Sequence, residues 1–250
     1  MYDFSHFPFL SQSVYTMNQP FDLYLVTGNI TLFCGKHSDA FKTDLLHSSL
    51  YSHLLAAKSA SNRELLWSTY NNTLAKIGWS QNSNTYKRVE QPVNSLLNII
   101  KGTTQHLISD TERQSLACSI SQLAKLPRDS LAIQLYLKRL QANSTNKQDT
   151  DTRPTSVRKN PWNSSMTVTI IRENGTIITT LVAFQATAMD ELEILNGAPV
   201  KPTLDSKNNI MVSSSFLDET NYRTFRQAIT GKVQNKLDTE LVHISQLLPD

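Results

Sequence analysis

Glycine is scarce in this chain, with seven residues among 250. Loops that cradle phosphate groups are rich in glycine, because only a residue without a Cβ lets the backbone approach a phosphate closely. The sequence has no Gly-x-Gly-x-x-Gly motif, no glycine-rich loop ending in Gly-Lys-Ser/Thr and no Gly-x-Ser-x-Gly motif. These absences argue against a nucleotide-binding loop and a nucleophile elbow, and they favour a protein without enzymatic activity.

Cysteine is scarcer still, since the chain has only Cys34 and Cys118. Two cysteines in a chain of this size are expected to stay reduced. Cys118 lies in a helical apolar pattern, where a buried thiol acts as a small apolar side chain. Cys34 precedes Gly35 in a predicted turn, so we expect it to be the more exposed thiol and a candidate for modification.

The sequence also lacks a clear metal-ligand spacing. The nearest approach is Cys34-x2-His37, followed by His47 and His53. Zinc takes four ligands, and His47 and His53 are six residues apart, which places them on different faces of one predicted helix. We therefore expect no metal and no other cofactor.

Long apolar runs are missing as well. No segment approaches the ~20 apolar residues that span a bilayer, and residues 1–19 lack a basic region followed by an apolar one. This pattern predicts a cytoplasmic protein, or one exported without a cleaved signal peptide. The formal net charge of +3, without a basic stripe, argues against nucleic acid as a partner.

Residues 37–141 form a predicted helical half. Its scaffold is Asp39–Trp79, which has the periodicity of two helices buried on broad faces. The aromatic residues of this stretch are expected to pack in the core. A short edge-like strand is predicted at 85–89, and further helices are predicted at 92–102, 110–125 and 131–140.

Residues 166–250 form a predicted β half. Apolar residues alternate from Met166 to Ile170, and Asn174-Gly175 is the signal for a two-residue type I′ hairpin turn. An amphipathic helix is expected over 218–248, with apolar residues at spacings of three and four. The remaining strands are predicted at 177–186, 192–195 and 209–216.

The predicted fold class is therefore α+β. An N-terminal helical layer packs on a C-terminal four-stranded antiparallel meander, and the long C-terminal amphipathic helix closes it. We expect the whole chain to form one compact domain.

Two segments outside these halves are the candidate binding surfaces. Residues 1–36 are an aromatic N-terminal arm that could include a β-hairpin over 21–33. Its aromatic residues could anchor a protein partner, a second subunit or a membrane surface, or the arm could instead wrap on its own core. Residues 142–165 are a polar, mobile loop with a basic end, which could equally be a solvated linker. The candidate partner-binding residues are Phe4, Phe7, Phe9, Arg158, Lys159 and Trp162.

Three stretches carry a resemblance to a known group of proteins: Leu54-Leu55-Ala56-Ala57, Trp67-x2-Tyr70-x3-Leu74-x2-Ile77-Gly78-Trp79 and Asn221-Tyr222-x2-Phe225-Arg226-x2-Ile229. The chain resembles a group of small, largely uncharacterised bacterial α+β proteins, some of them from pathogens or symbionts. The resemblance covers roughly Phe41 to Leu237 and rests mostly on core residues. It implies a shared fold and a role in interaction with a host or competitor, and it brings no catalytic residues.

Three classes of function stay open. The first is a non-enzymatic interaction protein of bacterial origin that binds a protein partner, as an exported virulence-type factor. The second is a membrane- or lipid-acting, toxin-like protein whose helical layer leaves the sheet so that apolar residues enter the bilayer. The third is an enzyme with a site assembled from distant residues. A homo-oligomer formed through the C-terminal helix or the N-terminal arm is a further expectation.

Overall fold

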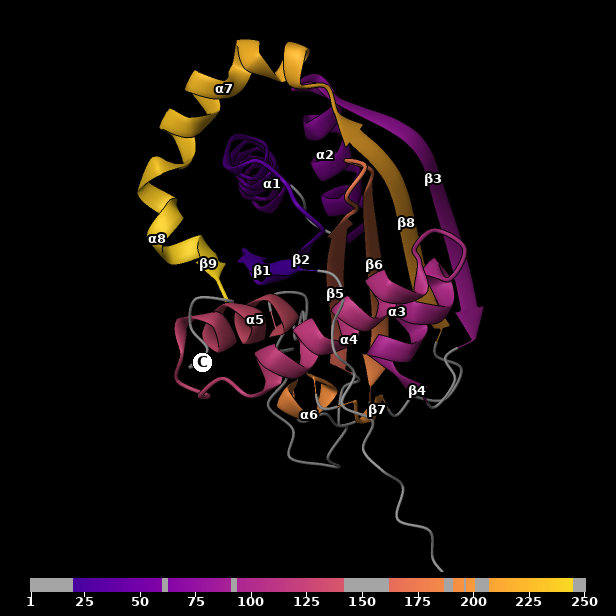
Figure 1. Ribbon diagram of the computed structural model, residues 1–250. Helices are drawn as coiled ribbons and strands as arrows, with labels where there is room; N and C mark the ends of the chain where they lie inside the picture. Colours follow the sequence, from indigo (N-terminus) through magenta and orange to yellow (C-terminus); the bar gives the residue numbers. More distant parts are fainter. Residues whose placement is uncertain are drawn as a thin grey trace, which may run out of the picture.

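The computed structural model of the protein describes residues 20–59, 63–90, 94–141, 162–186, 191–195, 197–200 and 207–244. Within these ranges the chain forms a seven-stranded mixed sheet with helices against both faces (Figure 1). The α+β class predicted from the sequence is confirmed. The strands of this sheet are β1 (Phe21–Val26), β2 (Asn29–Cys34), β3 (Trp79–Glu90), β5 (Trp162–Ile171), β6 (Ile177–Ala186), β8 (Lys207–Leu217) and β9 (Leu241–His243).

Hydrogen bonding orders these strands β3-β8-β6-β5-β2-β1-β9 across the sheet. The pair β2–β5 is parallel, and the other neighbouring pairs are antiparallel. The parallel pair matters because it joins the N-terminal hairpin to the C-terminal strands, with Ile30 beside Val168 and Phe33 beside Ile171. A separate two-stranded sheet pairs β4 (Asn94–Ser95) with β7 (Pro199–Val200).

The helices form two layers. Helices α1, α2 and α7 contribute to one apolar cluster, and helices α3 to α6 contribute to another on the opposite face of the sheet. Successive side chains of β1 alternate between the two clusters, as expected of a strand between two layers. Leu23 and Leu25 belong to the second cluster, whereas Tyr24 and Val26 belong to the first. The helices are α1 (Asp39–Ser59), α2 (Arg63–Lys76), α3 (Leu96–Thr104), α4 (Asp110–Ala124), α5 (Leu131–Gln141), α6 (Glu191–Leu195), α7 (Glu219–Val233), the 3₁₀ turn η1 (Gln234–Lys236) and α8 (Leu237–Glu240).

Helix α1 is the central helix of the first layer. Figure 1 shows it end-on, between the sheet and the arc made by α7 and α8. Two of its buried polar side chains have partners on the surrounding elements: the Asp44 carboxylate accepts hydrogen bonds of 2.8 and 2.5 Å from Arg226 of α7, and the Trp79 indole N–H donates to Ser48 Oγ at 3.0 Å. These bonds fix α1 relative to α7 and to the start of β3, because each buried polar group left without a partner would be costly.

The predicted four-stranded antiparallel meander is wrong in its composition. The strands predicted at 166–170, 177–186 and 209–216 are present as β5, β6 and β8, but residues 191–195 form the helix α6. A short apolar run fits a strand and a buried helical turn equally well, so periodicity could not separate them. The sheet also extends beyond the predicted meander on both sides, with β3 on β8 and β2 on β5.

The turn between β5 and β6 differs from its predicted type. At Asn174-Gly175 only Gly175 has a positive φ, of 80°, and its N–H donates to the Arg172 carbonyl at 2.8 Å. That is a three-residue turn with a glycine bulge instead of a type I′ turn. The pair with positive φ at both central residues is instead Thr27 (51°) and Gly28 (81°), between β1 and β2.

The long C-terminal helix is shorter than predicted. The helical path ends at Glu240, and Leu241–His243 pair with β1 as strand β9. The apolar residues of this segment fit a helix and a short strand equally well. The strand forms because the edge of β1 would otherwise be left without a backbone partner. In the described ranges, no helix combines the length and apolarity that crossing a membrane would need.

Candidate functional site

The residues predicted to bind a partner cannot be placed together. Phe4, Phe7, Phe9, Arg158 and Lys159 lie outside the described residues. The backbone of Trp162 begins β5 and pairs with Ala186, but its side chain is also outside the described part. Of the two segments, the arm ends in the hairpin β1–β2, and residues 162–165 of the loop belong to β5. The partner-binding role of the arm and the loop therefore stays a prediction.

Cys34 is placed differently from the expectation of an exposed thiol. Its side chain is 0% exposed, whereas Cys118 is the partly exposed cysteine. Burial, followed by the nearby Glu112 carboxylate, raises the pKa of Cys34 to about 12. Because the thiolate is the reactive form, this environment makes Cys34 a structural side chain.

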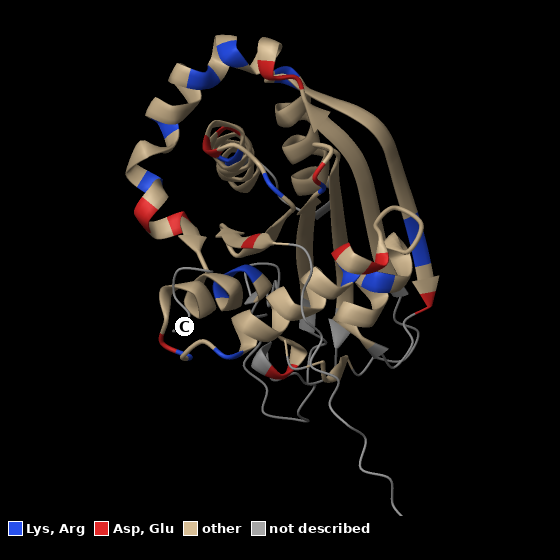
Figure 2. Cartoon of the chain, viewed as in Figure 1, with Lys and Arg blue, Asp and Glu red and all other residues tan. Residues whose placement is uncertain are grey.

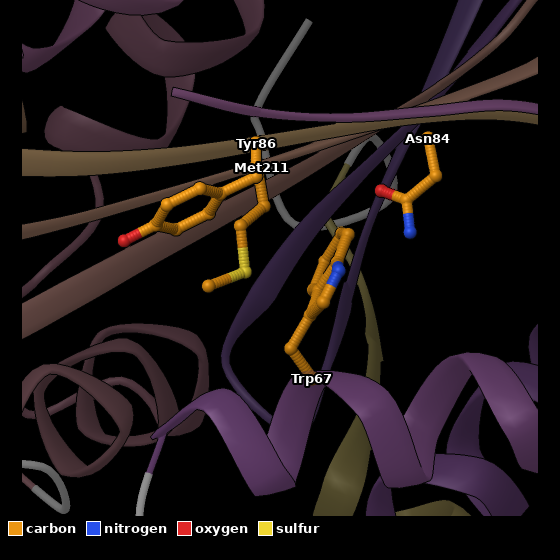
Figure 3. Close-up of a pocket in the computed structure, with 4 residues that line it drawn as sticks. All are labelled: Trp67, Asn84, Tyr86 and Met211. Atoms are coloured by element: carbon orange, nitrogen blue, oxygen red, sulfur yellow. The ribbon is translucent and has the colours of Figure 1, made fainter. Parts of the chain in front are cut away.

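The structure instead brings together an aromatic groove between α2 and the edge strand β3. The register of β3 and β8 places Tyr86 directly opposite Met211. Trp67 projects from α2 towards this pair, and Figure 3 shows its indole between Met211 and Asn84. These four residues line a cavity of about 340 Å³. We call it the α2–β3 groove, defined by Trp67, Asn84, Tyr86 and Met211.

A β-bulge sets which side chains of β3 face the groove. Asn82 is an extra residue on β3, with no partner of its own on β8. Successive strand residues point to opposite faces, so one extra residue changes the alternation. Gln81, opposite Ser215, and Asn84, opposite Ser213, consequently lie on the same face of the sheet. Without the bulge, Tyr86 would point away from α2.

Small side chains leave another gap between α2 and the sheet. A further cavity of about 20 Å³ lies between the same elements and is lined by residues that include Asn71, Trp79, Ser213 and Ser215. Serine side chains on β8 fill little volume, so they leave space between the sheet and the larger side chains of α2. Both cavities thus lie between α2 and the strands β3 and β8.

The groove has the chemistry of a binding surface. Trp67 is 7% exposed and forms its wall, while Tyr86 is 53% exposed and its hydroxyl donates to Asn209 Oδ1 at 3.1 Å. Its lining offers an indole, a phenol, a thioether and an amide, which supply apolar contact and hydrogen bonds. None of these four groups is a strong acid or base near neutral pH.

A third cavity, of about 380 Å³, lies at the β5–β6 turn and is lined by Ser109, Glu112, Arg172, Glu173 and Asn174. Two of its charged groups, Glu112 and Arg172, already have structural partners. Glu112 accepts from the Ser109 N–H in the capping box of α4, and Arg172 Nε donates to Glu112 Oε1 at 2.9 Å. We therefore regard this cavity as the gap around a helix cap and an ion pair.

A buried polar cluster joins residues of β2, α1, α2 and α5. Asn29 donates from Nδ2 to His53 Nε2 at 3.0 Å and accepts at Oδ1 from Arg139 Nε at 3.2 Å. His53 stacks on Tyr70 with ring centroids 4.2 Å apart. Because Asn29 uses its oxygen for Arg139, its NH₂ faces His53, and the neutral imidazole must carry its proton on Nδ1.

Burial sets the protonation of this cluster. Desolvation, reinforced by the Arg139 charge, lowers the pKa of His53 well below its usual value. Burial also lowers the pKa of Arg139, part of whose side chain is exposed, and raises that of Tyr70 to about 12. The folded protein therefore keeps His53 enclosed and neutral. In the described part of the chain, no group of three or more His, Cys, Asp or Glu residues could hold a metal ion.

Comparison with known proteins identifies no family for this chain. No family model matches the chain, and no curated protein matches it. Among solved structures, the chain is similar to a delta-endotoxin, at 10% identity and a TM-score of 0.35, over 75% of this chain and 80% of that one. It is similar also to the Evf virulence factor, at 12% identity and a TM-score of 0.33, over 89% of this chain and 83% of that one. Likenesses at these TM-scores carry no argument about function.

The sequence patterns placed Trp67 and Tyr86 on the correct elements but did not predict that they line a common groove. They assigned Trp67 to helix packing and 85–89 to a short edge-like strand, both in keeping with the structure. The remaining signal was Tyr86, an aromatic residue in a polar edge segment. Met211 gives no signal in the sequence, because the pairing of β3 with β8 joins residues more than a hundred positions apart.

Proposed function

We propose that this chain is a non-enzymatic interaction protein that binds a protein partner through the α2–β3 groove. The observation that carries the proposal is the aromatic cavity beside an exposed edge strand. Trp, Tyr and Met are enriched where proteins bind each other, because they bury a large area at a low entropic cost.

The shape of the groove supports a partner side chain as its occupant. Its wall is the buried Trp67 and its rim is the exposed Tyr86, so an apolar group that enters is covered on two sides. A cavity of about 340 Å³ is large enough for one or two side chains and at the lower end of what small-molecule sites need. Bacterial origin, export and a virulence-type role remain proposals that accompany this one.

Site-specific photo-cross-linking tests the proposal. A benzophenone amino acid at Asn84 in the groove, or at the control position Leu131 on α5, is irradiated with a lysate of the source cells. Leu131 is a suitable control because it is an exposed apolar residue (47%) away from the groove. We expect a discrete adduct from position 84 and not from position 131.

A matched pair of substitutions shows whether the groove captures that partner. Tyr86→Lys alters the rim, whereas Phe216→Lys alters an aromatic residue of similar exposure (43%) on the opposite sheet face. We expect Tyr86→Lys to reduce the adduct at least about fivefold, or about 1 kcal/mol, and Phe216→Lys to leave it. Equal adducts from both positions, or equal losses in both variants, would contradict the proposal.

A further inference from the structure

Strand β3 is a long edge whose backbone is open on one side. It pairs with β8 over its length, and in the described part of the chain no strand pairs with its other edge. Residues 81–90 are all exposed. On an edge strand, alternate residues direct their N–H and C=O groups outward, and only another extended backbone satisfies that whole row. The edge itself therefore selects an extended segment over a helix.

The charges on β3 add a second requirement. Lys87 and Arg88 are adjacent cations near the end of the strand, visible as the blue band on β3 in Figure 2. Arg88 is two residues from Tyr86, so it lies on the groove face, whereas Lys87 lies on the opposite face. Arg88 forms no ion pair with any described residue.

We propose that the partner contributes an extended segment that adds to β3 as a further strand, with an apolar side chain in the α2–β3 groove and a carboxylate two residues away against Arg88. The proposal rests on the proposed function and specifies its ligand. The spacing follows from strand geometry, because side chains two residues apart on an added strand lie opposite Tyr86 and Arg88. The recognised pattern is apolar-x-acidic along the segment.

A second copy of this chain fits the same edge less well. The groove face of β3 presents Asn84, Tyr86, Arg88 and Glu90 in turn. That order contains no apolar residue two positions from a carboxylate, so β3 cannot supply the pattern to another β3. A separate protein segment is therefore the occupant we expect.

Peptide selection tests the inference. A displayed library of random 12-residue peptides is selected on the full chain, and the affinity of synthetic peptides is measured by fluorescence anisotropy. We expect Leu, Ile, Met or Phe two residues from Asp or Glu to be enriched. Arg88→Glu should weaken such a peptide about tenfold, and changing the peptide's acid to Lys should restore binding to that variant. Lys87→Glu, the adjacent cation on the opposite face, is the control and should have a smaller effect.

The strand-addition step has its own readout. N-methylation of the peptide at alternate residues removes the N–H groups facing β3 in one set and those facing solvent in the other. One set should abolish binding and the other should not.

The remaining outcomes separate the two proposals. If binding needs Tyr86 but neither Arg88 nor either N–H set, the strand inference is overturned and the groove function stands. The inference is also overturned if the selection yields no peptide whose binding Tyr86→Lys weakens. In that case the cross-linking experiment alone decides whether the groove binds a protein partner. A dimer in sedimentation that Tyr86→Lys dissociates would show that a second copy occupies the edge, against the inference.

Discussion

His53 shows how one buried side chain can make the fold sensitive to acid. Its Nε2 accepts from Asn29, its ring stacks on Tyr70, and Arg139 lies close enough to disfavour a second positive charge. Protonation of Nε2 would place two donors face to face, since the Asn29 oxygen is already bonded to Arg139. The folded protein therefore holds His53 neutral at pH values where a free histidine takes up a proton.

We predict a loss of stability below about pH 6.5 that depends on His53. The unfolded chain titrates this histidine near 6.5, while the folded chain does so well below that value, so the unfolded state binds more protons in the window between them. Stability from this group is full above pH 6.5 and falls as pH drops, by up to about 1.4 kcal/mol per pH unit, until the folded pKa is reached.

Urea unfolding of His53→Gln between pH 7.5 and pH 5 measures this effect. Glutamine can still accept the Asn29 N–H but cannot become charged, so the variant should show a flatter dependence on pH than the original chain. Exposed His106 provides the control, and His106→Gln should keep the original slope. Burial also lowers the pKa of His47. The stability of the His53→Gln variant should therefore keep a smaller dependence on pH that comes from His47. Identical slopes in the His53 variant and the original chain would contradict the prediction.

At the scale of elements, the turn of the β1–β2 hairpin is fitted against helix α5. Gly28 has a φ of +81°, and a Cβ there would lie 2.3 Å from the Leu135 carbonyl oxygen and 2.6 Å from Arg139 Cβ. The same turn is held by the hydrogen bond from Thr27 N–H to the Glu240 carbonyl, at 2.7 Å. The hairpin thus contacts α5 on one side and the end of α8 on another, with no room for a side chain at Gly28.

Gly28→Ala should therefore cost more than Gly175→Ala. Both glycines have nearly the same positive φ, but a Cβ at Gly175 meets nothing within 4 Å. The backbone strain of an L-residue in this region, about 1–2 kcal/mol, is common to both variants. The steric clash is confined to Gly28 and should add a further ~2 kcal/mol. Urea unfolding of the two variants gives the difference directly. Equal losses would mean that the hairpin moves off α5 without cost.

Whole-molecule organisation is where prediction from sequence ends. Local patterns gave the helices around Asp39–Trp79 and the strands β5, β6 and β8, because periodicity of 3.6 and of 2 is written in neighbouring residues. The order of the strands depends on pairings such as β2 with β5, which no local pattern records. The groove has the same origin, because the distant Trp67 and Met211 come together only after β3 pairs with β8.

The two edges of the sheet differ in a way that has consequences for self-association. At one end β9 is a three-residue strand, and short edge strands offer little template for another chain. At the other end β3 has 12 residues and an exposed Val89 and Tyr86. The charges of Lys87 and Arg88 protect this edge against self-association, because both side chains would have to be desolvated if two molecules paired edge to edge.

Replacing both cations should therefore make the protein self-associate through β3. We expect the double variant Lys87→Thr, Arg88→Thr to show light scattering from oligomers at a concentration about tenfold lower than the original chain does, equivalent to about 1.4 kcal/mol in favour of association. The control is Arg223→Thr with Lys236→Thr, two exposed cations in α7 and η1, because it lowers the net charge equally and leaves β3 intact. If both double variants associate to the same extent, net charge and not the β3 edge governs solubility, because only the position of the lost charges differs between them.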